Sequence, residues 1–314
     1  MHHTEVAEHD VTNAYRSLAD TVAHDDPRWA FGSGVADVQA EITAPIPDGV
    51  DAADLAEYCL MLGDDALVCA QRLSEWVSNA PELEEEVALA NIALDLLGQA
   101  RVLLARAGHV EGLGSAAGWA GRGRDEDALA YQRAESDFRN VALAELPDDL
   151  DFGRAIARLL LFATWRLALL HRLLGSRDPV VAAVAGKGVK EMAYHRDYAG
   201  RWTLRLGDGT AESHRRMQAA LEAVWPHFEE LFRASDVERR LAESGVAVDP
   251  AEIRAEVDAV LDEVLARATL ARPQVPPAGT IGGRGGRQGL HTEYLGHLLA
   301  EMQSLARQHP GVTW

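Results

Sequence analysis

Glu191 and His195 come nearest to a metal-binding pair in this sequence. Two-metal sites inside helical bundles use a carboxylate from each of two helices and a Glu-x-x-His pair from each of the other two. The three-residue spacing matters because side chains at i and i+3 share one helix face. Glu191 and His195 are four residues apart, and Met192 stands three residues before His195. A thioether suits a hard, oxygen-rich iron site poorly, so we interpret Glu191 and His195 as a core or helix-surface pair.

The other helical segments offer still fewer ligands. Asp95 is followed three residues later by Gly98 instead of His, and the apolar run Leu159–Leu170 contains no carboxylate. We interpret Asp95 as a buried, hydrogen-bonded carboxylate, and Asp64 and Asp65 as surface charges. The sequence therefore predicts that this chain binds no metal.

Other kinds of chemistry find little support. The sequence has no Gly-x-Ser-x-Gly nucleophile motif and no Walker loop. Cys59 and Cys69 are ten residues apart in one predicted helix, about 15 Å along its axis, so they cannot pair with each other. A Gly-Gly-Arg-Gly-Gly-Arg run lies within residues 272–289, but no strand precedes it, and we expect this segment to be a flexible linker.

The charge of the chain excludes some classes of partner. Its formal net charge is -19, which repels nucleic acid phosphates and anionic lipid, so we expect no nucleic acid and no membrane as partners. No stretch approaches the roughly 20 uninterrupted apolar residues of a membrane helix. The first residues also lack the apolar segment of a signal peptide. We therefore expect a cytoplasmic protein.

The elements that carry these residues are predicted to be helices throughout. Residues 1–54 have little apolar periodicity, and we predict that they form an N-terminal extension that is mobile or loosely docked. A 3.6-residue apolar period runs from Leu55 nearly to the end, which predicts one all-α domain over residues 55–314. The four long helices are expected at about 55–77, 82–108, 151–174 and 179–206, with a long crossover between the second and third and further helices after residue 210.

The second of these helices carries two apolar stripes instead of one. The stripes are Leu83/Val87/Ala90/Leu94/Leu97/Leu104 and Leu89/Ile92/Leu96/Leu103. Because each stripe has to bury itself against something, two stripes predict two neighbours for this helix, as in a bundle interior.

Three segments of the sequence resemble one known family. They are SEWVSNAPELEEEVALANIALDLLGQAR, DPVVAAVAGKGVKEMAYHRDYAGRWTLRLGDGT and GRQGLHTEYLGHLLAEMQSLARQHPGVTW. From about Leu55 to Trp314 the chain is similar to the PaaC family, the C subunits of bacterial 1,2-phenylacetyl-CoA epoxidases, which are multicomponent monooxygenases. The resemblance implies a ferritin-like four-helix bundle with additional C-terminal helices and without a metal centre.

The same resemblance implies where the lost ligands would stand. The ligand positions of the homologous catalytic A subunit fall at Leu96, Gln99, Ala163, Met192 and His195. A first-helix ligand would fall close to Gly63 or Asp64. Of the five positions, His195 alone retains the ligand type, so the resemblance implies a degenerate di-iron site.

The resemblance also implies partners and cofactors. The A subunit would hold the di-iron centre and bind the CoA ester, and a reductase subunit with NADPH, flavin and iron-sulfur would supply electrons. This chain would bind no cofactor and would have no catalytic activity of its own. We therefore expect a structural subunit that scaffolds the A subunit in phenylacetate degradation.

Two alternatives and one possible interface remain at this point. The first alternative is a free-standing metal-dependent oxygenase with an unorthodox ligand set, Asp64, Asp95, Glu191 and His195. The second is a CoA-ester binding module in which Arg284 and Arg287 contact phosphates. A possible subunit interface comprises Arg284, Arg287, His291, Glu293 and Tyr294.

Overall fold

The computed structural model describes residues 42–113, 123–310 and 312. Most of the predicted extension, residues 1–41, lies outside the described residues. Within the described ranges the chain is helical and has no strand beyond an isolated bridge between Ile281 and Arg284. The predicted all-α fold is confirmed.

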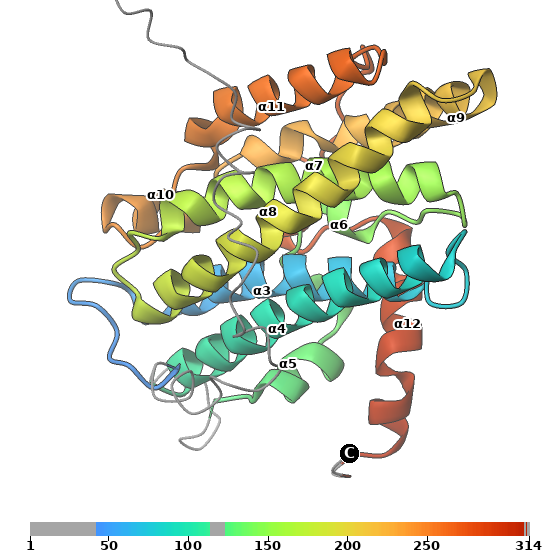
Figure 1. Ribbon diagram of the computed structural model, residues 1–314. Coiled ribbons are helices and arrows are strands. Elements are labelled where there is room, and N and C mark those ends of the chain that lie inside the picture. Colours follow the sequence, from blue (N-terminus) through green and yellow to red (C-terminus); the bar gives the residue numbers. More distant parts are fainter. Residues whose placement is uncertain (1–41, 114–122, 311, 313–314) are drawn as a thin grey trace, which may run out of the picture. The chain divides into compact units, whose positions relative to one another are not determined.

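Four long helices form the bundle (Figure 1). They are α3 (Ala52–Ser74), α4 (Leu83–Leu113), α7 (Phe152–Leu173) and α8 (Pro179–Gly207). α3 packs along α4, α7 packs along α8, and α4 also contacts α8. The connection between α4 and α7 is long and contains the short helices α5 (Glu126–Tyr131) and α6 (Ala142–Glu145). Four packed helices with one long crossover are the arrangement of a ferritin-like bundle.

Aspartates begin three of the bundle helices. Asp51 accepts hydrogen bonds from the backbone N–H groups of Ala53 (2.9 Å) and Asp54 (3.1 Å) at the start of α3. Asp151 and Asp178 bind the first N–H groups of α7 and α8 in the same way. These contacts satisfy donors that have no partner inside the helix, typically stabilising it by about 1 kcal/mol each.

Further helices from the C-terminal half cover the α3 and α7 side of the bundle. They are α9 (Ala211–Val224), α10 (Asp236–Glu243), α11 (Arg254–Arg267) and α12 (Glu293–Gln308). α9 and α11 pack against α7 and α8, whereas α10 and α12 pack against α3. α3 is consequently packed on several sides, by α4, α6, α10 and α12.

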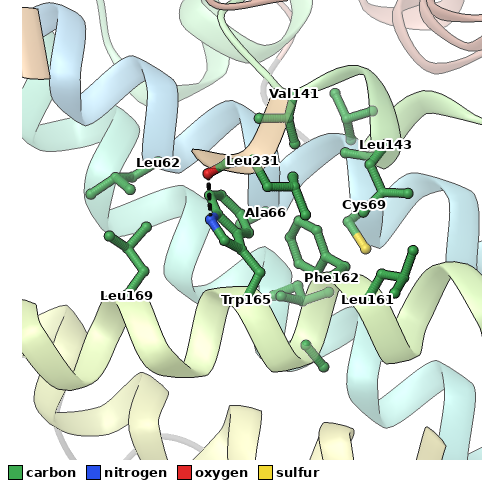
Figure 2. Close-up of a cluster of buried hydrophobic side chains, with 14 of the residues drawn as sticks. Leu62, Ala66, Cys69, Val141, Leu143, Leu161, Phe162, Trp165, Leu169 and Leu231 are labelled. Carbon is green, nitrogen blue, oxygen red and sulfur yellow. Dashed lines mark hydrogen bonds between the residues drawn. The ribbon is translucent and has the colours of Figure 1, made fainter. Parts of the chain in front are cut away.

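The apolar core lies between α3, α7 and the crossover (Figure 2). Leu62 and Cys69 of α3 face Phe162 and Trp165 of α7, and all four are buried. The Trp165 indole N–H donates to the Leu231 carbonyl oxygen at 2.9 Å, so this polar atom is satisfied within the core. Burial raises the pKa of the Cys69 thiol to about 11, which keeps it protonated at neutral pH.

α4 is the one helix in the described part that could cross a membrane, judged by its length and composition alone. Of the most apolar 18-residue stretch of α4, 44% is buried within the protein. A core helix of a bundle has the same composition, because it also needs apolar side chains toward its neighbours.

Candidate functional site

The predicted ligand positions all lie inside the bundle, on α4, α7 and α8. Leu96, Gln99, Ala163, Met192 and His195 are each buried. Leu96 and Ala163 have no oxygen or nitrogen in their side chains, and Met192 offers only a thioether. Three of the five positions therefore present no donor that suits iron in an oxygen-rich site.

A hydrogen-bonded chain of polar side chains occupies this part of the core. The Gln99 amide N–H donates to a Glu191 carboxylate oxygen at 2.9 Å. The Gln99 oxygen accepts from Arg166 Nε at 3.0 Å, and Arg166 Nη2 donates to the Leu62 carbonyl oxygen at 3.2 Å. Through these bonds one guanidinium and one amide link all four bundle helices, which is what a metal centre does in a ferritin-like bundle.

Arg166 places a positive charge where the resemblance puts the lost metal site. It stands three residues after Ala163 on α7, so the two positions share a helix face, and it is fully buried. Burial lowers the pKa of Arg166, and the charge of Asp65 opposes this effect. A guanidinium nevertheless remains protonated in proteins, so Arg166 repels a metal ion at this position.

His195 pairs with α4 instead of with Glu191. Its Nε2 lies 3.0 Å from Asp95 Oδ2, and the His195 ring is fully buried while the Asp95 side chain is 24% exposed. Glu191 bonds to Gln99 and to the exposed Lys187, whose Nζ lies 3.2 Å away. Glu191 and His195 are thus both in the core, but they do not pair with each other. Each bonds to a different residue of α4, Glu191 to Gln99 and His195 to Asp95.

The unorthodox ligand set of the first alternative is not assembled. Asp64 binds Arg133, Asp95 binds His195, and Glu191 binds Gln99. Across residues 42–113 and 123–310, no group of three or more His, Cys, Asp or Glu side chains is placed to hold one metal ion. The residues present at this site do not fit a di-iron centre.

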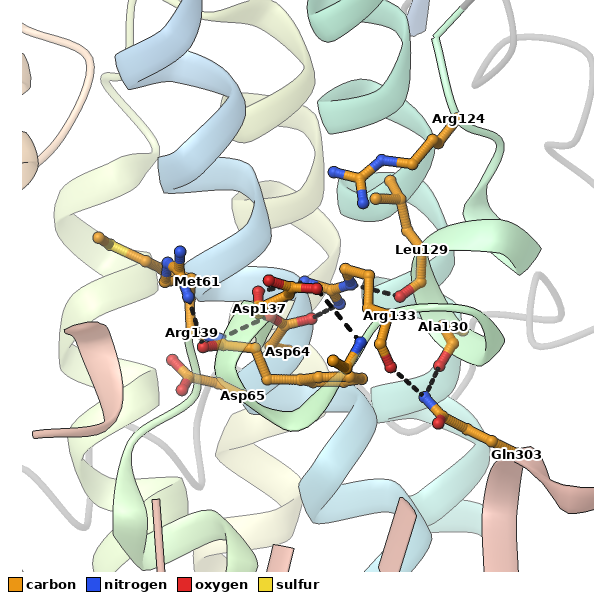
Figure 3. Close-up of polar contacts among 12 residues, drawn as sticks. Met61, Asp64, Asp65, Arg124, Leu129, Ala130, Arg133, Asp137, Arg139 and Gln303 are labelled. Atoms are coloured by element: carbon orange, nitrogen blue, oxygen red, sulfur yellow. Dashed lines mark hydrogen bonds and ion pairs between the residues drawn. The ribbon is translucent and has the colours of Figure 1, made fainter. Parts of the chain in front are cut away.

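Asp64 and Asp65 correct the sequence interpretation, because they are not surface charges but fully buried (Figure 3). Asp64 accepts from both terminal nitrogens of Arg133, with Nη1 at 3.0 Å, and from the Arg139 backbone N–H at 2.9 Å. Asp65 accepts from Arg287 Nη1 at 3.0 Å and Nη2 at 2.9 Å. One signal could have revealed them: two adjacent acids in the middle of an apolar helix have no solvent-facing stripe to occupy.

Arg287 corrects two further predictions. It is buried, and besides Asp65 its Nη1 donates to the carbonyl oxygens of Met61 (3.1 Å) and Arg139 (2.8 Å). Phosphate binding would break these bonds, so the CoA-ester alternative loses one of its two arginines. The segment is also docked instead of flexible: a Cβ added at Gly286 would lie 2.1 Å from the Asn140 carbonyl oxygen.

His291 is turned inward like Arg287, and the subunit interface predicted to include both residues stays a prediction. The His291 Nδ1 lies 3.2 Å from Glu145 Oε2, and both side chains are fully buried. Burial alone would lower the pKa of His291, but the hydrogen bond and charge of Glu145 outweigh it and raise the pKa. Arg284, Glu293 and Tyr294 are exposed, and their role in an interface stays a prediction.

The fold and this site together define a ferritin-like bundle in which three of the five ligand positions hold apolar side chains and a buried arginine, Arg166, bonds to a fourth, Gln99. The family model described as phenylacetic acid catabolic protein matches residues 40–314, and the chain belongs to this family. The chain is 45% identical over 260 residues to the C subunit of the 1,2-phenylacetyl-CoA epoxidase of Escherichia coli (strain K12). That match covers 83% of this chain and 99% of the relative, and it confirms the predicted resemblance.

Proposed function

We propose that this chain is the structural, non-catalytic subunit of a phenylacetyl-CoA 1,2-epoxidase complex, in which it scaffolds a di-iron catalytic A subunit. The observation that carries the proposal is the core at the ligand positions. Leu96, Ala163 and Met192 supply no iron ligand there, and the Arg166 cation links the helices instead. The similarity to the C subunit of an epoxidase supports the assignment to this complex.

In this function the chain provides a fixed surface for its partner and catalyses no reaction itself. A scaffold has to keep its surface in one conformation, and buried hydrogen-bonded charges with packed apolar helices serve that purpose. The Arg166 network and the Asp64 and Asp65 pairs hold α3, α4, α7 and the crossover in one arrangement without a metal ion. Iron, CoA-ester binding and oxygen insertion would belong to the A subunit, and NADPH, flavin and iron-sulfur to the reductase.

The proposal places this chain in the cytoplasm, without nucleic acid or membrane as partners. A net charge of -19 supports the exclusion of nucleic acid and anionic membrane, because a strongly negative chain is repelled by polyanions. The homologous A subunit and the other epoxidase subunits, including the reductase, are the partners that the proposal requires.

Two measurements test the function. Co-expression with the A subunit should give a complex that survives purification at mild salt, and failure to co-purify would overturn the scaffold role. Elemental analysis of the chain purified alone from iron-supplemented medium should find almost no iron. About two irons per chain would instead identify a working metal centre and a catalytic subunit.

A further inference from the structure

A row of large apolar side chains lies exposed along the outer side of α4. Leu83 is 70% exposed, Val87 52%, Leu94 46% and Leu97 44%. These four residues, called the α4 stripe below, are members of one of the two apolar stripes of this helix, and Ala90 lies half-buried between Val87 and Leu94. Single exposed leucines are common, but four in sequence on one helix face form a continuous patch.

The described part of the chain covers only one of the two apolar stripes of α4. Residues of the other stripe, Leu89, Ile92, Leu96 and Leu103, are all buried. α4 buries them by packing against α3, α5 and α8, whereas the C-terminal helices pack on other parts of the bundle. Figure 1 shows α4 and α8 on the near side of the bundle, with α3 and α7 behind them. The α4 stripe thus faces away from the core that this chain builds.

The spacing of the stripe matches another helix. Leu83, Val87, Ala90, Leu94 and Leu97 alternate steps of four and three residues, which is the heptad spacing that packs side chains of one helix between those of a second.

The charges on and around the stripe favour a partner that is not a second copy. The exposed Glu82 and Glu84 lie at the start of the stripe, and the whole chain carries a net charge of -19. Two such chains repel each other, whereas a helix with basic side chains opposite Glu82 and Glu84 is attracted.

We propose that the α4 stripe is the docking surface for a long helix of a partner subunit. The partner helix has an apolar heptad stripe and basic residues at the end that meets Glu82 and Glu84. This inference rests on the proposed function, in which the chain is one subunit of a complex, and it names the surface that the complex uses.

The first test replaces apolar contact area by polar side chains of similar length. Leu94→Gln/Leu97→Gln keeps residues that favour helix. We expect the Kd of the full chain for the purified A subunit to rise about tenfold or more. The matched control is Leu174→Gln/Leu305→Gln, two leucines that are 48% and 54% exposed at the end of α7 and on α12, and it should leave the Kd unchanged. Circular dichroism and the Tm should show that both variants fold.

The second test addresses the charges. Glu82→Gln/Glu84→Gln should weaken binding at low salt and reduce its dependence on salt concentration. Glu243→Gln/Glu252→Gln, which removes two exposed acids from elsewhere on the surface, should have neither effect.

The outcomes separate this inference from the proposed function. If the unaltered chain does not bind the A subunit, the proposed function itself fails. If the unaltered chain binds and Leu94→Gln/Leu97→Gln binds equally well, the function stands and the docking surface is wrong. If Leu174→Gln/Leu305→Gln weakened binding and Leu94→Gln/Leu97→Gln did not, the interface would lie at the end of α7 or on α12 instead of on α4. Self-association of the chain, or binding to phosphatidylcholine vesicles, that is lost in Leu94→Gln/Leu97→Gln would also overturn the assignment, because the occupant would then be a second copy or a lipid surface.

Discussion

α3 and α4 are both long apolar helices of the same bundle, but the rest of the chain buries them to different extents. α3 has 17 of its 23 residues buried, whereas α4 has 12 of 31. Arginines from the crossover and from the C-terminal segment reach α3 and neutralise its two central acids. The outer side of α4 keeps exposed leucines and receives no such cover within the described residues. This difference is the one expected if a partner subunit covers the α4 stripe, as proposed above.

The two helices also differ in what a substitution should do. On the α3 side, buried charges depend on partners from distant segments, so removing one partner leaves an uncompensated charge. On the outer side of α4, side chains have open space around them. Stability should therefore respond strongly on the first side and weakly on the second.

The largest effect is expected for Arg287→Met. This change leaves the buried Asp65 carboxylate without its guanidinium, and loss of one partner of a buried pair typically destabilises a protein by about 3–5 kcal/mol. Urea unfolding would measure the loss. The exposed Arg284→Met serves as control and should stay within about 0.5 kcal/mol of the unaltered chain. Equal effects of the two variants would contradict the structural role of Arg287.

Arg166→Met should have a smaller effect on stability and none on metal content. The change leaves the buried Gln99 side-chain oxygen without its donor, at a cost of about 1–3 kcal/mol, while it removes a charge whose Nη1 has no partner. We expect a net loss near the lower end of that range. Elemental analysis should still find no iron, because Leu96, Ala163 and Met192 supply no ligand. Iron uptake by this variant would show that Arg166 alone had excluded the metal.

Two glycine substitutions contrast the covered and open sides directly. Gly286→Ala should destabilise the chain by about 1–3 kcal/mol, because the new Cβ would lie 2.1 Å from the Asn140 carbonyl oxygen. Gly98→Ala on α4 meets nothing within 4 Å and should stabilise the chain by about 0.5–1 kcal/mol, since alanine favours helix over glycine. Thermal unfolding of both variants measures the contrast. A loss of stability in Gly98→Ala would mean that this part of α4 is already covered.

The smallest effect should be a pH dependence on the covered side. The pKa of His291 is raised in the folded chain by Glu145. A raised histidine pKa stabilises the folded state below the usual value of about 6.5 and loses this contribution as the pH rises through the folded-state pKa. The difference in unfolding free energy between the unaltered chain and His291→Gln should accordingly shrink from pH 6 toward pH 8. A difference that is constant with pH would show that the ion pair does not form.

The sequence by itself determined the fold class and the order of the long helices, and it predicted a bundle without a Glu-x-x-His ligand set. These features depend on local patterns: apolar residues at a 3.6-residue period, Asp178 and Pro179 at a helix start, and residue types at fixed spacings within one helix. Such patterns act between neighbours in sequence, so they are readable without a structure. The same periodicity predicted two neighbours for α4.

Only the tertiary structure decided which polar residues are buried and which apolar ones are exposed. Asp64 and Asp65 were mistaken for surface charges because Arg133 is 69 positions and Arg287 is 222 positions away in sequence, too far for any local pattern to connect them. The sequence of segment 272–289 predicts a flexible linker because its anchor, Arg287, is recognisable only beside α3. A charge can be buried when its partner arrives from elsewhere in the chain, and that arrival is a property of the assembled fold.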